Sequence, residues 1–185
     1  MKTLQSRWLA SGVLFAALSF SLVAAAKLSS TGAGSAGFAA KGPGGINIDG
    51  KTSDVRVADD GKTVTITVGL AGIETGMGLR DKHAKEALEV ETYPTAELKV
   101  ARGDLKFPAA GAESSGDAKG TLKIHGQTKD VTFHYTAKLD GDTLNVKGTA
   151  SNVNMNDFGI TTPSYLGVGV RPEVDVNVTF HAKDN

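Results

Sequence analysis

The chain contains no cysteine among its 185 residues. This absence excludes disulfide bonds, thiolate metal sites and a lipid-modified N-terminal cysteine. Tryptophan is nearly absent too, because Trp8 is the only one, and aromatic residues make up 6% of the sequence. The fold must therefore be stabilised by a core of mostly aliphatic side chains without covalent cross-links.

The chain also lacks an excess of either charge, because 20 basic residues balance 20 acidic ones. Loss of residues 1–26 would remove Lys2 and Arg7 but no acid, which leaves 18 basic against 20 acidic side chains. A nucleic-acid-binding surface needs clustered basic residues. We therefore expect no nucleic acid partner.

The first 26 residues have the pattern of a secretory signal peptide. Lys2 and Arg7 precede an apolar run at 9–23, and three alanines follow at 24–26. Serines and a glycine interrupt this run, which is short for a stable membrane span. We predict a signal peptide at 1–26, one domain at 27–185 and a bacterial protein that is periplasmic or secreted, with no stable span after the signal is removed.

Most of the remaining chain alternates apolar and polar residues, which predicts strands with one apolar face. Val64, Ile66 and Val68 share such a face, and the turn at 59–61 joins their strand to the one at 55–57. The pattern recurs at 96–100, 122–124, 131–137, 144–148 and 174–180. We expect a turn at 126–129 and a mobile loop at 108–117. In the glycine-rich segment 27–45, we favour a first strand at 35–41 over a flexible leader.

Seven or eight amphipathic strands cannot all be covered by one short helix, so either two sheets stack or one sheet closes on itself. Closure removes exposed strand edges, and we predict an all-β fold, an antiparallel barrel of about eight strands. Periodicity leaves open whether the interior is filled by side chains or holds a ligand.

One dense helix-forming run, at 79–94, interrupts the strands. Ala84, Ala87 and Leu88 share one helical face, Asp81 can accept hydrogen bonds from free amides, and Pro94 prevents continuation. We predict a short helix near residues 80–89 that closes the end of the barrel.

The polar residues do not form a catalytic or metal-binding pattern. His125, His134 and His181 alternate with apolar residues, so we expect all three to point outward, where they form no compact ligand set. We expect a surface or capping role for His83, near Arg80 and Asp81. The serines lie in glycine-rich loops without a nucleophile elbow, and no phosphate-binding loop is present. We therefore expect no enzyme activity, no metal and no cofactor.

The segment 152–170 is glycine-punctuated but carries Phe158, Tyr165 and Leu166. It fits a rim folded over a barrel mouth and plain core packing equally well. The apolar residues expected to face the lumen and touch a ligand are Val68, Leu70, Met77, Leu79, Phe133, Tyr135, Phe158 and Phe180.

Three sequence features occur in an order that resembles the YceI-like family of exported bacterial proteins, also called polyisoprenoid-binding-like. They are Arg80-Asp81-Lys82-His83 with Tyr93-Pro94, the hairpin at 120–129, and Asn156-Asp157-Phe158-Gly159-Ile160 followed by a strand at 173–178. The resemblance covers about residues 53–182. It implies a lipocalin-like barrel with an elongated apolar cavity for an isoprenoid chain or a similar long-chain amphiphile, and it does not imply catalysis.

The chain departs from the pattern of this family at several places. Ala84 occupies a position where the family commonly has leucine, and Met155 stands where a basic residue is common. We expect a periplasmic carrier for a long apolar ligand. The alternative is a non-catalytic stress or interaction protein whose barrel is filled and whose loops bind a protein. Monomer and dimer both remain open.

Overall fold

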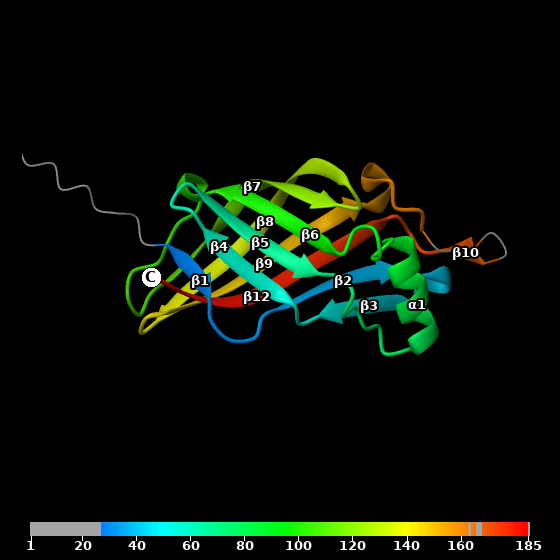
Figure 1. Cartoon of the computed structure of the whole chain (residues 1–185), viewed down its shortest axis with the longest axis horizontal. Helices are drawn as coiled ribbons and strands as arrows, with labels where there is room; N and C mark the ends of the chain where they lie inside the picture. The colour runs from blue at the N-terminus through cyan, green and yellow to red at the C-terminus, as the bar shows by residue number, and fades with distance from the viewer. Residues whose placement is uncertain (1–26, 163, 166–167, 185) are drawn as a thin grey trace, which may run out of the picture.

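The computed structural model describes residues 27–162, 164–165 and 168–184. The predicted signal peptide at 1–26 and Leu166 of the predicted rim lie outside them. Ten strands form one antiparallel sheet, which is rolled into a barrel elongated along the long axis of the molecule (Figure 1). They are β1 (Leu28–Ser30), β2 (Ser35–Lys41), β3 (Asn47–Thr52), β4 (Val55–Asp59), β5 (Thr63–Gly69), β6 (Thr95–Ala101), β7 (Glu113–Ile124), β8 (Gln127–Asp140), β9 (Thr143–Asn154) and β12 (Glu173–Asp184).

Eight of these strands close a barrel, which confirms the predicted fold class. The ring runs β1-β4-β5-β6-β7-β8-β9-β12 and closes because β1 pairs with both β4 and β12. The hairpin β2–β3 lies beyond β1 on the same edge of β12, where it pairs with the Val174–Thr179 half of that strand. It therefore extends the barrel wall at one end (Figure 1).

The alternating pattern places aliphatic side chains inside the barrel, as predicted. Val64 on β5 and Val100 on β6 face each other across the ladder and are each 2% exposed. Threonines take the intervening positions on β5, where β-branched side chains suit a pleated strand. The core is thus built from valine, leucine, isoleucine and alanine, with Phe133, Tyr135 and Phe180 among its few buried rings.

The helix α1 (Gly78–Ala87) follows β5 and lies across one end of the barrel (Figure 1). It starts two residues before the predicted range 80–89 and ends two residues before the end of that range. Leu88 follows as its C-cap, and Glu89 has a positive φ of 47° that turns the chain away. Among the described residues, no helix is both long and apolar enough to cross a membrane.

Strand prediction succeeded at 35–41 but missed β1 and β3. β3 carries Gly50 opposite Phe38 in the ladder. A Cβ at Gly50 would lie 2.3 Å from Cε1 of Phe38, so the ring packs directly over the glycine backbone. The same glycine breaks the apolar alternation on which the prediction depended.

The expected mobile loop at 108–117 is wrong in its second half. β7 begins at Glu113, and its first residues pair with β8 from Lys138 to His134. Gly116 lies opposite Tyr135, and a Cβ there would stand 3.6 Å from the phenol ring. The small residues that resembled a loop therefore belong to a strand that packs against an aromatic ring.

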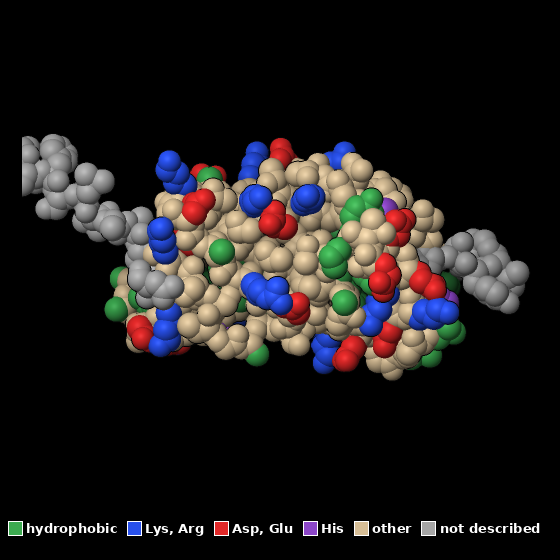
Figure 2. All heavy atoms as spheres, viewed as in Figure 1, with side chains coloured by type: hydrophobic (Ala, Val, Ile, Leu, Met, Phe, Trp, Pro, Cys, Tyr) green, Lys and Arg blue, Asp and Glu red, His purple; other side chains and the backbone are tan. Residues whose placement is uncertain are grey.

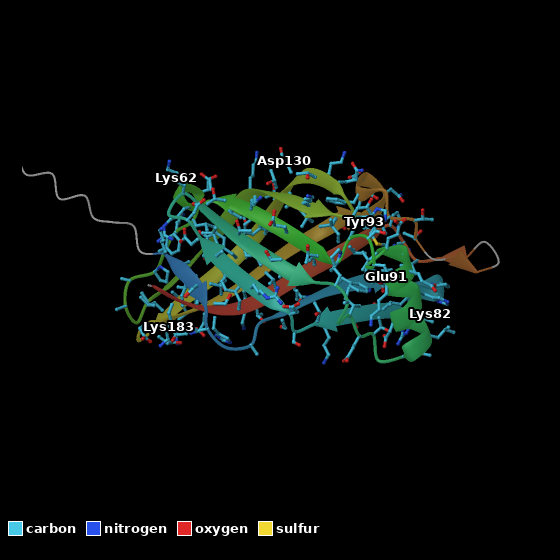
Figure 3. All side chains as sticks on the ribbon, viewed as in Figure 1. Lys62, Lys82, Glu91, Tyr93, Asp130 and Lys183 are labelled. Atoms are coloured by element: carbon cyan, nitrogen blue, oxygen red, sulfur yellow. The ribbon has the colours of Figure 1, made fainter. Side chains whose placement is uncertain are left out.

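A buried ion pair lies at the barrel end opposite α1. Arg102, in the short helix η2 (Arg102–Asp104), pairs with Asp59, whose side chain is 0% exposed. The Arg102 guanidinium also lies 4.3 Å from the centre of the Phe107 ring. Lys62 and Lys183 mark this end in Figure 3, far from Lys82 beside α1. The two ends of the barrel are thus built differently.

Candidate ligand-binding cavity

The barrel is hollow in the half next to α1, where a chamber of about 740 Å³ lies between the sheet and the helix. Its wall is mostly apolar and comes from β2, β3, β5, β6, β7, β8, β9, β12 and α1. Wall residues include Phe38, Ile48, Val68, Leu70, Ile73, Leu98, Leu122, Ile124, Val131, Phe158, Ile160 and Val174. A chamber of this size and character is typical of a small-molecule site.

A second chamber of about 100 Å³ continues toward the opposite end of the barrel. The two chambers share seven wall residues, namely Ile66, Leu98, Phe133, Ala150, Val176, Asn177 and Val178. Phe133 carries the only aromatic ring of these seven and is 9% exposed. Its ring lies at the junction, with its centre 6.3 Å from that of Tyr135. The interior therefore has a wide chamber next to α1 and a narrow one beyond it, and Phe133 borders both.

One face of α1 forms the wall of the wide chamber. Arg80, His83, Ala84, Ala87 and Leu88 all border it, at the i, i+3, i+4, i+7 and i+8 spacing of a single helical face. The predicted common face of Ala84, Ala87 and Leu88 is therefore confirmed. Ala84 and Leu88 also pack against the buried cluster of Leu70, Ile73, Val90 and Ala96.

A hydrogen-bond network fixes the start of this helix. Asp81 Oδ1 accepts hydrogen bonds from the amide and the hydroxyl of Thr75, both at 2.6 Å. These bonds, with smaller contributions from Lys85 and Arg80, hold the pKa of Asp81 below its ordinary value of 3.8. Arg80 Nη2 donates to the carbonyl oxygen of Thr75 at 3.1 Å. Asp81 thus accepts a hydrogen bond from a free amide, as predicted, but this amide belongs to Thr75, which precedes the helix.

His125 does not point outward, which corrects the prediction. Its side chain is 12% exposed, Nδ1 lies 3.1 Å from the carbonyl oxygen of Phe158, and its ring meets Tyr93 edge-on at 4.9 Å. Nε2 lies 3.3 Å from Glu89 Oε1, an ion-pair distance without hydrogen-bond alignment. His125 and Gly126 have positive φ angles of 51° and 72° and form the tight turn between β7 and β8, one residue before the predicted turn.

His134 and His181 do lie on the outer surface, as predicted. His134 pairs with Asp117 at 2.8 Å and is 55% exposed, and His181 lies 2.6 Å from Asn145. Within the described part of the chain, no three His, Asp or Glu side chains come together as a metal site. Figure 2 shows both signs of charge interspersed over the visible face.

The structure divides the predicted lumen residues into three groups. Val68, Leu70, Phe133 and Phe158 border the wide chamber, whereas Tyr135 and Phe180 border the narrow one. Met77 and Leu79 lie outside both walls and are 55% and 65% exposed. They flank the start of α1, and Leu79 precedes Arg80 by one residue, so it faces away from the cavity side of the helix. Direct contact of the other six with a ligand stays a prediction.

Sequence reasoning missed Arg80 and His83 as wall residues. The signal was present, because both lie on the same helical face as Ala84 and Ala87. Asp81 binds Thr75 instead, so these three polar residues do not converge on one pocket.

The rim segment supplies part of the wall. It consists of the short helix η3 (Met155–Phe158) and a hairpin of β10 (Ser164–Tyr165) and β11 (Val168–Gly169), which lies at the α1 end in Figure 1. Phe158 and Ile160 are 2% and 3% exposed and border the wide chamber. The first part of this segment therefore does both things that the sequence allowed: it packs in the core, and it forms part of the rim of the chamber.

The sequence profile of the YceI-like domain matches residues 26–182. The chain belongs to the YceI-like family. Two UPF0312 proteins, from Pseudomonas putida and Pseudomonas syringae pv. tomato, are 30% and 28% identical over 129 and 144 residues. These matches cover 63% and 71% of this chain, and 62% and 68% of the relatives' own length. The family predicted from the three sequence features is confirmed.

Solved structures share the fold of this YceI-like protein. A polyisoprenoid-binding domain from Saccharophagus degradans superposes with a TM-score of 0.71 at 14% identity, over 87% of this chain and 99% of that domain. BcnA from Burkholderia cenocepacia gives a TM-score of 0.64 at 19% identity, over 81% and 96%. Such low identities establish the architecture alone.

Proposed function

We propose that this YceI-like protein is a binding or carrier protein for a long apolar ligand, a polyisoprenoid or another long-chain amphiphile, held inside the barrel. The observation that carries the proposal is the chamber of about 740 Å³ with its mostly apolar wall. The shared fold with a domain described as polyisoprenoid-binding supports the same ligand class.

Binding in such a chamber is driven mainly by burial of apolar surface, at about 25 cal/mol per Å² removed from water. Few polar contacts are needed along the tail, because hydrocarbon presents no groups to pair. The elongated interior, wide at α1 and narrow beyond Phe133, suits an unbranched or prenyl chain better than a compact molecule. Specificity for the tail is therefore broad.

The test is native mass spectrometry of protein purified from its own host, combined with lipid extraction and identification of the extract. We expect a bound species that leaves on denaturation and returns when a prenyl or acyl chain is added. A protein that is empty as isolated and takes up neither kind of chain contradicts the proposal.

The alternative of a protein-binding role rested on a filled barrel. The wide chamber removes that premise, and the interior is instead suited to a small molecule. We propose a non-catalytic role, since Glu97, a carboxylate that borders the chamber with Arg80 and His83, pairs with Lys99 at 2.8 Å and so is not arranged with them as a general acid or base pair.

We also propose export with loss of residues 1–26, on the basis of their charge and apolar pattern. The test is expression in a Gram-negative host followed by cell fractionation and intact-mass measurement. Periplasmic protein that lacks about the first 26 residues is expected. Cytoplasmic protein that keeps residues 1–26 contradicts it.

A further inference from the structure

Arg80 is a half-buried cation in a mostly apolar wall, and its guanidinium makes one hydrogen bond to the described residues. Its guanidinium carries five N–H donors. Nη2 donates to the carbonyl oxygen of Thr75, while Nε is buried and has no hydrogen-bond partner among the described residues. A buried polar group without a partner costs free energy, and a charged one costs more.

No described carboxylate forms an ion pair with this guanidinium, although the charge of Arg80 contributes to the lowered pKa of Asp81. No carboxylate there lies within the 4.0 Å ion-pair limit of Arg80. Asp81, its neighbour in sequence, accepts both of its hydrogen bonds from Thr75. Glu97 also borders the chamber, but its carboxylate pairs with Lys99 at 2.8 Å.

Resting on the proposed carrier function, we propose that Arg80 binds the anionic head group, a carboxylate or a phosphate, of the amphiphile in the barrel. Both oxyanions match the planar fork of a guanidinium, which can give them two parallel hydrogen bonds. His83, one helical turn further on the same face, offers a second donor to the same anion.

The cavity face of α1 sets the orientation of the ligand. Its N-terminal part presents Arg80 and His83, and its C-terminal part presents Ala84, Ala87 and Leu88. The head group therefore lies at the start of the helix, and the tail runs past Leu88 toward Phe133. The cavity face of α1 is thus polar at one end and apolar at the other, which matches the polar head and the long apolar tail of an amphiphile.

The experiment compares three probes with one common tail: farnesol, farnesoic acid and farnesyl monophosphate. Competitive native mass spectrometry gives their relative affinities for the full mature protein. The wild type is expected to prefer farnesoic acid over farnesol by about tenfold, the ratio given by about 1.4 kcal/mol of charge-assisted hydrogen bonding. The ratio of the acid to the monophosphate distinguishes the two head groups.

Arg80→Gln is expected to bring the acid-to-alcohol ratio near one, because the acid loses a charged hydrogen-bond donor and the alcohol does not. Lys82→Gln is the matched control, because Lys82 lies on the same helix with its side chain 71% exposed and paired with Glu86. It should keep the wild-type ratio. Arg80→Lys keeps the charge but loses the fork, so its ratio should fall between those of the wild type and Arg80→Gln.

A wild-type ratio near one overturns the proposal, and so does an Arg80→Gln variant that loses affinity for acid and alcohol by the same factor. If Arg80→Gln does not fold, the wild-type ratio and Arg80→Lys decide the question. Inorganic phosphate and acetate, added alone, should displace farnesoic acid weakly and farnesol not at all. Failure of all three farnesyl probes to bind would instead contradict the carrier function.

Discussion

Nδ1 of His125 lies 3.1 Å from the carbonyl oxygen of Phe158, and this contact joins the tight turn between β7 and β8 to the segment that covers the wide end of the barrel. Phe158 borders the chamber, so His125 supports the cavity wall from behind. Tyr93, labelled in Figure 3, lies beyond the end of α1, and its ring meets the His125 ring edge-on. One imidazole therefore connects three segments around the mouth of the cavity.

We expect His125→Ala to lower the free energy of unfolding by about 1–3 kcal/mol, because a buried carbonyl loses its partner and the Tyr93 ring loses its contact. Urea denaturation of purified protein measures this change. His134→Ala on the outer face is the control and should change stability by less than about 0.5 kcal/mol. Equal effects of the two substitutions would show that His125 is not a structural residue.

Phe133 is expected to limit the length of the bound tail. Phe133→Leu should widen the junction between the two chambers and shift binding toward longer acyl chains, whereas Phe133→Trp should shift it toward shorter ones. Native mass spectrometry with a mixture of fatty acids of graded length reads the preference directly. Unchanged preference in both variants would show that the tail does not reach Phe133.

Phe133→Asp should impair folding and binding together, because it buries a carboxylate in the core.

Ala84 gives the wide chamber part of its volume. Ala84→Leu adds three carbons to the cavity face of α1, so we expect lower affinity for bulky prenyl chains and a smaller effect on slender acyl chains. Glu86→Leu on the same helix adds a leucine on the exposed side, where the Glu86 side chain is 59% exposed. That control should leave both affinities as they are. A loss of affinity in both variants would point to a change in the helix rather than in the cavity.

Asp81 makes the start of α1 sensitive to acid. Because its pKa in the folded state is lowered, its contribution to stability is present above the ordinary value of 3.8 and is lost as pH falls through the lower folded-state value. Asp81→Asn should therefore be less stable than the wild type near neutral pH, and the difference should shrink below pH 3.8. Denaturation curves of both proteins across this range test the sign. A difference that grows toward acid would contradict it.

Much of the barrel could be predicted, because its strands carry a strict alternation with a single buried face. The burial of Val64 and Val100 could be predicted from that alternation alone. The prediction failed where a partner elsewhere in the chain decides the structure. Gly50 belongs to a strand because Phe38 packs on it, and Gly116 because Tyr135 lies opposite.

The cavity was less accessible to sequence reasoning than the barrel. Alternation identifies inward-facing residues such as Phe133 and Phe180, but it cannot tell a filled interior from a hollow one. His125 lies at a left-handed turn position, where the alternation that predicted its direction no longer applies. Met77 and Leu79 are apolar yet exposed, since residues at the start of a helix follow neither the two-residue period of a strand nor the 3.6-residue period of a helix.

The pairing of β1 with the end of β12 has a consequence for how the protein is made. Leu28 lies opposite Asp184, so the first and last strands of the domain complete the ring together. β12 is made after the other strands of the sheet, and until it is made β1 has no partner that closes the ring. Such distant pairings fold slowly because long loops must close first. The closed barrel therefore forms only after β12 has been made, and the ligand is loaded after that point.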